Sequence, residues 1–414
     1  IYSLNQELDL TCANTLTFSD NAMIGDIEPP YAINFMNAIT QTTNFRSGWN
    51  WWSSYVDLAD INGLAMLEEG LGEAGVQIKS QSKFVINYGT TWLGGLNAIN
   101  NEQTLKVQVN APITVDLTSK PVSPADYPLT LNAGWNWIGY PCTNSLSVAN
   151  AFSNYAPVSG DQVKTQAAYA IYRAGVGWIG GLRTLNPGDG LFFYSTNGGT
   201  LVFPEGTRGT DLAENTTTDD NHWVPDMSAY PSNMTVTAVV ELEDVELQSE
   251  RYELAAFANG EVRGSARLMY VEPMDRYMAF LTVTGDEAAN LTFGLYDTET
   301  GAECLESDDL LVFTADAMVG ELESPMVVSF RGTTGLNDLE RSLQVYPNPV
   351  KRGERAILTL PVDAKAQVEV VNALGVVIET SRATSVQAPA SPGVYTLRIT
   401  VDGKGTISRK LVVR

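Results

Sequence analysis

Residues that commonly do chemistry in proteins are sparse in this chain, apart from carboxylates. The single histidine, His222, lies in the acidic stretch TDDNHWVP, and the three cysteines are Cys12, Cys142 and Cys304. A Ser-His-Asp or Cys-His site would have to use His222, yet neither a nucleophile elbow nor a strand–turn–helix pattern surrounds it. One histidine and three scattered cysteines also fall short of a four-ligand zinc site. The sequence favours a solvated loop position for His222 and small buried side chains for the cysteines.

Asp and Glu number 48, so counting does not exclude a two-carboxylate glycosidase. These acids, however, fall in small repeated segments, and no large unique domain is evident that would form a cleft around two of them. The loop TDDN at 218–221 has oxygen ligands that suit Ca²⁺, although EF-hand spacing is absent. We therefore expect a stretch that is not an enzyme and has no cofactor, with Ca²⁺ at this loop as the alternative. A catalytic domain encoded upstream would be invisible here.

Tryptophan is the residue type with two competing interpretations, and seven of the eight lie in two related segments. Trp49 and Trp51 alternate on one expected strand, and Trp135 and Trp137 on another, so each pair points to one face. An inward face would make them core, and an outward face would make them a platform for sugar rings. The repeated position favours core. The remaining three are the candidates for ligand binding: Trp52, Trp92 and Trp178.

Two kinds of internal repeat organise the chain. In the first kind, type A, LTFSDNAMIGDIEPPYAINF at 16–35 returns as LVFTADAMVGELESPMVVSF at 311–330, with eight of twenty positions identical. In the second kind, type B, GWNWW at 48–52 returns as GWNWIGYP at 134–141, followed in both copies by a K-x-Q strand and a W-x-G-G-L turn. Each type B copy has one segment that could form a short helix, at 59–72 and 145–156. The rest alternates as β-structure does.

These patterns predict a mostly β, multi-domain string of small β-sandwich-like modules that ends in an Ig-like β-sandwich. The expected order is a type A remnant at 1–40, type B repeats at 46–118 and 129–204, an acidic linker at 205–228, a complete type A domain at 229–331, a linker at 332–342 and the last module at 343–414. Because 1–40 aligns with the last third of a type A domain, we expect the sequence to be the C-terminal part of a longer protein.

Charge divides the chain into two parts. The net charge is −23, which disfavours nucleic acid and anionic membranes as partners. Residues 343–414 hold ten basic and five acidic side chains, a net of +5, whereas residues 1–342 hold 15 basic and 43 acidic, a net of −28. This asymmetry predicts that the last module meets a different partner from the rest.

The last module reads as a compact β-domain. LQVYPNPV is a short strand stopped by two prolines, and the following segments alternate cleanly, with Leu358/Leu360 and Val368/Val370 marking inward faces. Turns are expected at 372–375 and 402–403. Two packed sheets of three or four strands, an Ig-like sandwich without its disulfide, would fit.

The motifs LQVYPNPV, VVNALGVVI and PGVYTLRITVDGKGTISRKLVVR, in this order, resemble the C-terminal sorting domain of type IX secretion cargo in the Bacteroidota. Type A and B repeats are also similar to modules of large surface proteins in that phylum, which transfer no activity. The matching positions are Tyr346, Pro347, Asn348, Pro349, Gly375, Gly393, Tyr395, Lys410, Leu411, Val412, Val413 and Arg414.

The resemblance implies a secreted protein at the cell surface or outside the cell. The partners would be an outer-membrane translocon, its shuttle barrel and a sortase that joins the new C-terminus to an anionic lipopolysaccharide. The cut would fall within 332–342, and the candidate residues are Gly332, Thr333, Thr334, Gly335, Leu336, Asn337 and Asp338. On physical grounds RKLVVR at 409–414 could present a strand edge for pairing, Leu411 and Val413 could simply be core, and both can be true together.

We therefore expect residues 1–332 to be a non-catalytic β-rich stalk or accessory region and 343–414 an export and attachment signal. One alternative is an adhesin whose A and B repeats bind glycan or host protein. Another is a set of accessory modules of a hydrolase encoded upstream.

Overall fold

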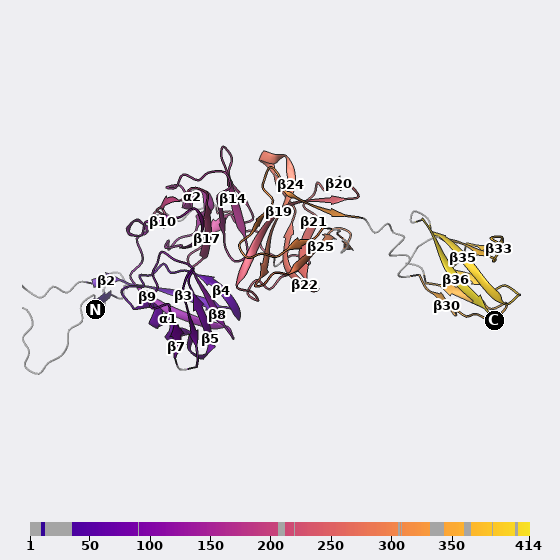
Figure 1. Cartoon of the computed structure of the whole chain (residues 1–414), viewed down its shortest axis with the longest axis horizontal. Helices are drawn as coiled ribbons and strands as arrows, with labels where there is room; N and C mark the ends of the chain where they lie inside the picture. Colours follow the sequence, from indigo (N-terminus) through magenta and orange to yellow (C-terminus); the bar gives the residue numbers. More distant parts are fainter. Residues whose placement is uncertain are drawn as a thin grey trace, which may run out of the picture. The chain divides into compact units, whose positions relative to one another are not determined.

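A computed structural model describes residues 10–12, 35–89, 91–205, 212–218, 220–304, 307, 309–331, 343–359, 366–382, 384–401 and 405–414. The chain is mostly β and divides into two compact units, Ile1–Phe330 and Arg331–Arg414. The first unit contains several small antiparallel sheets, and the second contains two, as the alternating patterns predicted. Figure 1 labels the elements of both units.

The amino-terminal end of the first unit is a pair of short strands, β1 (Leu10–Cys12) and β2 (Phe35–Asn37). Cys12 pairs with Phe35. In the later copy of the repeated segment, the positions 295 residues further along, Ser307 and Phe330, form an isolated bridge. Equivalent positions are therefore neighbours in both places.

The first module after this pair is built around one helix and two sheets. Its elements are β3 (Ile39–Phe45), β4 (Gly48–Trp52), α1 (Gly63–Leu71), β5 (Gly75–Lys79), β6 (Phe84–Asn87), β7 (Trp92–Gly94), β8 (Leu105–Val109) and β9 (Ile113–Ser119), with a 3₁₀ turn at Gly72–Ala74. The five-stranded sheet has the order β4-β8-β5-β6-β7, and β3 pairs with β9. Leu64, Leu67 and Leu71 lie on one side of α1 and are buried in the module core.

The second module repeats this five-stranded order. Its elements are β10 (Leu129–Leu131), β11 (Gly134–Gly139), β12 (Leu146–Ser147), α2 (Val148–Ala151), β13 (Gln162–Lys164), β14 (Tyr169–Arg173), β15 (Gly177–Gly180), β16 (Thr184–Leu185), β17 (Gly190–Ser195) and β18 (Gly199–Leu201), preceded by a 3₁₀ turn at Pro124–Asp126. The main sheet is β11-β17-β13-β14-β15, and β10–β18 and β12–β16 form two small pairs. Both predicted helices are present, and α2 is only one turn long.

The asparagine of each GWNW strand has the same local role. The side chain of Asn50 accepts a hydrogen bond from the Arg46 amide at 2.9 Å and donates to the Arg46 carbonyl at 2.8 Å. Asn136 makes the same two bonds with Asn132, at 2.8 and 2.9 Å. Each asparagine therefore fixes the tight turn that precedes its strand.

The third module is a sandwich of two larger sheets. Its elements are β19 (Ser232–Leu242), β20 (Val245–Glu246), β21 (Tyr252–Ala258), β22 (Glu261–Arg267), β23 (Met269–Val271), β24 (Arg276–Gly285), β25 (Asn290–Asp297), β26 (Ala302–Cys304), β27 (Leu311–Val312), β28 (Met318–Val319) and β29 (Met326–Phe330), with a 3₁₀ turn at Glu272–Met274. One sheet contains β20-β19-β24-β23 with β28 and β29 parallel to β19, and the other contains β22-β21-β25-β26 with β27. The expected Asn259-Gly260 hairpin is present, with φ of 52° and 80° at the two residues.

The GWNW tryptophans lie in a joint between modules, which corrects both interpretations drawn from the sequence. Trp51 and Trp137 stack on Phe192 with ring centroids 3.9 and 4.3 Å away, so the outward faces of the two five-stranded sheets pack on each other. The Trp135 Nε1 donates to the Asp316 carbonyl of the third module. Trp49 and Trp51 are buried, and Trp135 and Trp137 are half-buried. They neither fill the core of their own repeat nor form an open platform.

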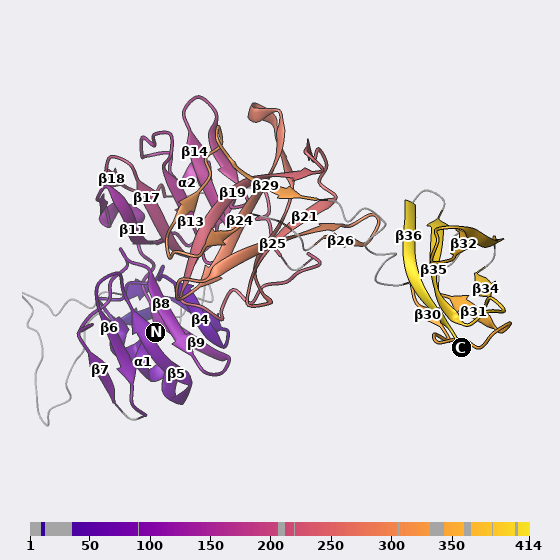
Figure 2. The same ribbon diagram turned by 45° about the vertical axis from the view of Figure 1, so that its right-hand side comes forward.

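Two buried lysines complete this joint. The Lys106 Nζ lies 4.5 to 4.9 Å from the ring centroids of Trp51, Trp137 and Phe192, and burial lowers its pKa to about 7. The Lys164 Nζ lies 2.8 Å from Asp316 Oδ1, and burial lowers its pKa although this carboxylate opposes the shift. The hydroxyl of Thr104 adds bonds to the backbone of β11 and β17. The first unit is therefore one body of joined modules (Figure 2).

Described parts of the predicted acidic linker 205–228 are hydrogen-bonded to two modules, although many of its side chains are exposed. Asn215 Oδ1 accepts hydrogen bonds from the amides of Arg183 and Thr184 in the second module. The amides of His222 and Trp223 donate to the Glu253 carboxylate in the third. Asn215 therefore contacts the second module, and His222 and Trp223 contact the third.

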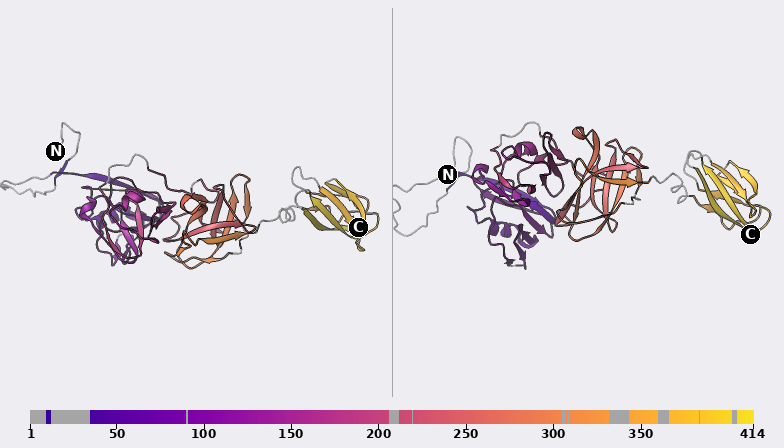
Figure 3. Two further views of the ribbon diagram at one scale, coloured as in Figure 1. Left: turned by 90° about the horizontal axis from the view of Figure 1, so that it is seen from above. Right: turned by 45° about the horizontal axis from the view of Figure 1, so that its top comes forward.

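The second unit is a two-layered β-domain with its own apolar core. Its strands are β30 (Val345–Tyr346), β31 (Arg355–Leu358), β32 (Ala366–Val371), β33 (Val377–Ser381), β34 (Ser385–Gln387), β35 (Gly393–Val401) and β36 (Gly405–Val413). They form a three-stranded sheet, β30-β31-β34, and a four-stranded sheet, β33-β32-β35-β36. The prediction of two sheets of three or four strands is confirmed, and the long pair of β35 and β36 is yellow in Figure 3.

Candidate functional site

The Tyr346–Pro349 motif of the second unit fastens the start of this unit to β36. The Asn348 side chain donates to the Lys410 carbonyl at 2.6 Å and accepts from the Val412 amide at 2.9 Å. Two residues on, the Val350 amide donates to the Val412 carbonyl and the Val350 carbonyl accepts from the Arg414 amide, both at 2.9 Å. We call this set of contacts the Asn348 clamp. It leaves Tyr346 as a large exposed side chain.

The clamp decides between the two interpretations of the segment RKLVVR. Leu411 and Val413 are buried in the core, at 0% and 3% exposure, so the core interpretation is confirmed. The outer edge of β36 at 410–414 is already hydrogen-bonded to Asn348 and Val350. This part of the strand is therefore not a free edge for pairing, while Lys410 and Arg414 point their charges to solvent.

The glycines of the motif set lie where the backbone turns or begins a strand. Gly375 has φ of 80° in the β32–β33 turn, which Asn372 Oδ1 holds by accepting from the amides of Leu374 and Val376. Gly393 begins β35 opposite Val413. The Tyr395 hydroxyl donates to the Ser391 carbonyl at 2.9 Å and lines a surface hollow of about 390 Å³.

Exposed apolar side chains gather around the same turn. Leu374 is 88% exposed, and Val376 in the turn and Val377 and Ile378 in β33 are also exposed. Apolar surface of this kind, rimmed by polar residues, is typical of a protein–protein contact. The seven candidate cleavage residues, Gly332 to Asp338, lie outside the described residues.

The three tryptophans proposed for ligand binding differ in exposure. Trp52 is 3% exposed, packs on Phe45 and donates to Thr43 Oγ1 at 3.0 Å, so it has no face to offer a ligand. Trp92 and Trp178 are half-buried and lie in strands β7 and β15, not in turns. Trp178 lines a surface hollow of about 400 Å³ together with Tyr270.

The single histidine lies against the third module. The His222 ring stacks on Tyr296 at 3.9 Å, and its Nε2 lies 2.6 Å from Glu303 Oε1.

Burial raises the pKa of the Cys142 thiol to about 11, which keeps it protonated and unreactive at neutral pH. Within the described residues no three His, Cys, Asp or Glu side chains come together as metal ligands would. Of the TDDN segment, Asn221 donates to Ser265 Oγ, and Asp219 is outside the described residues.

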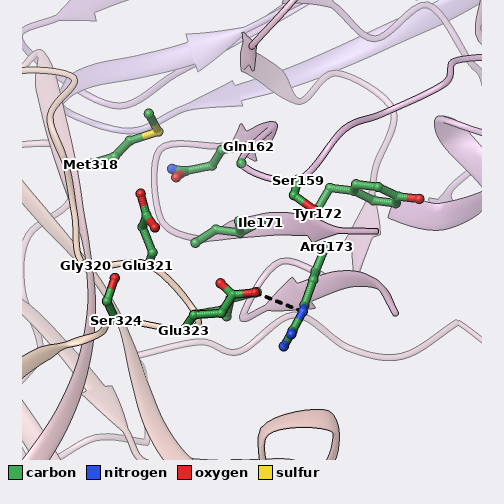
Figure 4. Close-up of a pocket in the computed structure, with 12 residues that line it drawn as sticks. Ser159, Gln162, Ile171, Tyr172, Arg173, Met318, Gly320, Glu321, Glu323 and Ser324 are labelled. Carbon is green, nitrogen blue, oxygen red and sulfur yellow. Dashed lines mark ion pairs between the residues drawn. The ribbon is translucent and has the colours of Figure 1, made fainter. Parts of the chain in front are cut away.

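A cleft of about 500 Å³ opens between the second and third modules (Figure 4). Strand β14 contributes Ile171 and Arg173, and the turn after β28 contributes Glu321 and Glu323. The Arg173 Nε lies 3.0 Å from Glu323 Oε1 across the cleft. No sequence pattern identified this cleft, because its two walls are 150 residues apart and meet only through the packing of two modules.

Comparisons with known proteins identify the second unit. Residues 344–414 match the family model of the secretion system C-terminal sorting domain. This domain marks the chain as cargo of the type IX secretion system, exported to the cell surface or the extracellular space. No helix among the described residues is long and apolar enough to cross a bilayer.

Solved structures and curated sequences add little about the first unit. The chain is similar to the Bacillus anthracis TIE protein, at 9% identity and a TM-score of 0.16, over 93% of this chain and 68% of that chain. It is also similar to dimeric latent PorU from Porphyromonas gingivalis, at 9% identity and a TM-score of 0.14, over 91% of this chain and 32% of that one. Such low TM-scores support no argument about fold. No curated protein matches the chain.

Proposed function

We propose that residues 343–414 act as a folded export signal that the type IX translocon and its shuttle barrel recognise. A sortase then cuts within 332–342 and joins the preceding region to an anionic lipopolysaccharide. The observation that carries this proposal is the match of residues 344–414 to the sorting-domain family. The Asn348 clamp supports recognition of the folded form, because the motif residues are hydrogen-bonded to one another within a closed β-domain.

The first unit would be the non-catalytic region that this signal delivers. Its modules, which we take as repeats of types A and B, belong to one compact unit with an aromatic and lysine joint, and this supports a role as a stalk or spacer. Its buried Cys142 and ion-paired His222 are poorly suited to nucleophilic catalysis. We further propose that the second unit is an Ig-like β-sandwich.

Export of the whole chain tests the signal. We expect the chain, placed behind a secretory signal peptide, to reach the surface of a type IX-competent host and to remain periplasmic in a secretion-deficient strain. Deletion of 343–414 should retain it in the periplasm of both. Mass spectrometry of the surface form should place its new C-terminus within 332–342. Periplasmic retention of the intact chain in the competent host would refute the proposal.

A point variant tests whether the folded form is what is recognised. Asn348→Ala removes both side-chain bonds of the clamp, which should cost roughly 2 kcal/mol and lower the ratio of closed to open module about thirtyfold, so we expect the surface fraction to fall. Thr380→Ala, at an exposed position of β33, is the matched control and should be exported normally. Limited proteolysis measures whether the module is loosened. If Asn348→Ala is loosened and is still exported normally, recognition does not require the closed form, which contradicts this part of the proposal.

A further inference from the structure

The cleft between the second and third modules has a rigid wall on the side of the third module. Leu322, at the centre of the turn after β28, is 3% exposed and inserts among Tyr169, Val239 and Phe280. Gly320, with φ of 75°, lets the turn approach β19 so closely that a Cβ there would lie 2.2 Å from the Thr237 carbonyl. The turn is thus fixed on both sides of Leu322, and the exposed Glu321 and Glu323 flank an anchored residue.

These two carboxylates differ in what they contact. Glu323 lies 3.0 Å from the Arg173 guanidinium, which also reaches Met274 Sδ at 2.9 Å. The Glu321 carboxylate has no hydrogen-bonding or ion-pair partner in the described residues. Figure 4 shows it pointing toward Gln162 and Met318, away from the ion pair. The cleft therefore contains one neutralised carboxylate and one free carboxylate.

A buried amide lies on the other side of the free carboxylate. Gln162 is 1% exposed, and its Nε2 donates to Thr235 Oγ1 at 2.9 Å across the module boundary. Its Oε1 accepts no hydrogen bond within the described part of the chain, and the amide end points toward Met318 in Figure 4. Gln162 lines the cleft, so this oxygen can accept a hydrogen bond from a ligand or from water there. Gln162 therefore favours a ligand that brings N–H or O–H donors.

The remaining lining and the charge of the region define that ligand further. Ile171 and Met318 place aliphatic surface next to the two acceptors, and the tyrosine ring of Tyr172 points away from the cleft. Residues 1–342 have a net charge of −28, which attracts cations and repels anions. A side chain with an aliphatic stem and a cationic, donor-rich head complements all three features.

We propose that this cleft binds a lysine or arginine side chain of an extended basic segment on another protein. The cationic head donates to the Glu321 carboxylate and to Gln162 Oε1, and its stem lies on Ile171 and Met318. Arg173 competes with the incoming cation, because it neutralises Glu323 and adds a positive charge to the site. The proposal is independent of the sorting role of residues 343–414.

Two variants with opposite expected signs test it. The probe is a fluorescein-labelled peptide, Gly-Ser-Lys-Val-Lys-Ser-Gly, titrated with the whole chain and followed by fluorescence anisotropy at low ionic strength. Glu321→Gln should weaken binding about fivefold, in the upper range for one exposed ion pair. Arg173→Gln should strengthen binding about threefold, because it removes the competing cation and frees Glu323. A probe with both lysines replaced by glutamine should bind at least tenfold more weakly.

Matched controls separate the cleft from net charge. Glu287→Gln removes an exposed carboxylate in the turn between β24 and β25, and Arg382→Gln removes an exposed cation from the second unit. Both should leave the affinity unchanged, and near-ultraviolet circular dichroism should show native packing in all four variants. Equal weakening by Glu321→Gln and Glu287→Gln would show that only overall charge is sensed. Weaker binding by Arg173→Gln, or binding of a neutral oligosaccharide in place of the peptide, would assign a different ligand and overturn the proposal.

Discussion

The two five-stranded sheets of the first unit share a strand order but place different side chains at the same point of their joint. Lys106 is the cross-strand neighbour of Trp51 in the first sheet, and Phe192 is the neighbour of Trp137 in the second. Phe192 stacks with both tryptophans, and the ammonium of Lys106 lies near all three rings. A lysine in place of Phe192 would add a further positive charge to a joint where Lys164 already disfavours the charged form of Lys106. The comparison shows that similar modules join through a position where they differ.

The largest expected effect comes from removing the aromatic half of the joint. Phe192 is fully buried, so Phe192→Ala should lower the free energy of unfolding of the first unit by about 4 kcal/mol through lost apolar burial and a cavity. Urea titration followed by tryptophan fluorescence measures this change. Phe84→Ala, at a 45% exposed position of β6, should cost less than about 1 kcal/mol. A loss below about 1 kcal/mol for Phe192→Ala would mean that the joint contributes little.

The lysine half of the joint should make stability depend on pH. Burial lowers the Lys106 pKa to about 7, against 10.5 for an exposed lysine, so between these values the unfolded state binds one more proton. The free energy of unfolding therefore rises with pH across this window, by about 2.5 kcal/mol between pH 7 and pH 9. Below pH 7 Lys106 is protonated in both states, so its contribution no longer changes with pH. Lys106→Met should remove this increment from the pH profile of urea unfolding. Lys83→Met, which removes an exposed ammonium, should keep it; identical profiles for all three proteins would contradict the assignment.

A third exchange makes the first module more like the second. Trp52 and Ile138 occupy equivalent positions, directly after GWNW in strands β4 and β11, and Trp52 fills space beside Phe45. Trp52→Ile should cost about 2 kcal/mol, because the smaller side chain leaves a cavity and the Thr43 hydroxyl loses its donor. Thermal unfolding of the first unit measures it. Phe45→Leu in the same core tests additivity, and a double variant whose cost equals the sum of the two single costs would show that the pair is not coupled.

Local features of the fold follow from local patterns. The Asn259-Gly260 turn, the helix in each GWNW module and the alternating core of the second unit were predictable because each depends on neighbouring residues. The sequence also identified the Tyr346–Pro349 motif. It did not predict that Asn348 binds residues 410 and 412, because this contact joins positions more than sixty residues apart.

Features of the joint were not predictable for a related reason. The sequence showed the tryptophan pairs on one face of each strand, but not which module would cover that face. A lysine within a strand reads as solvent-exposed, yet Lys106 and Lys164 are buried because three modules meet around them. The cleft beside Glu321 has the same origin, since its walls belong to different modules. Packing between modules, unlike turns and strands, leaves little trace in a single sequence.

The Asn348 clamp joins the two ends of the sequence of the second unit. Its first motif is hydrogen-bonded to its last strand, so the position of the motif depends on that strand. A chain shortened before Lys410 would lose the partner of Asn348 together with the buried Leu411 and Val413. A translocon that binds only the closed form would therefore bind only chains in which both ends of the module are present. Incomplete chains would not be exported, and no separate proofreading step would be needed.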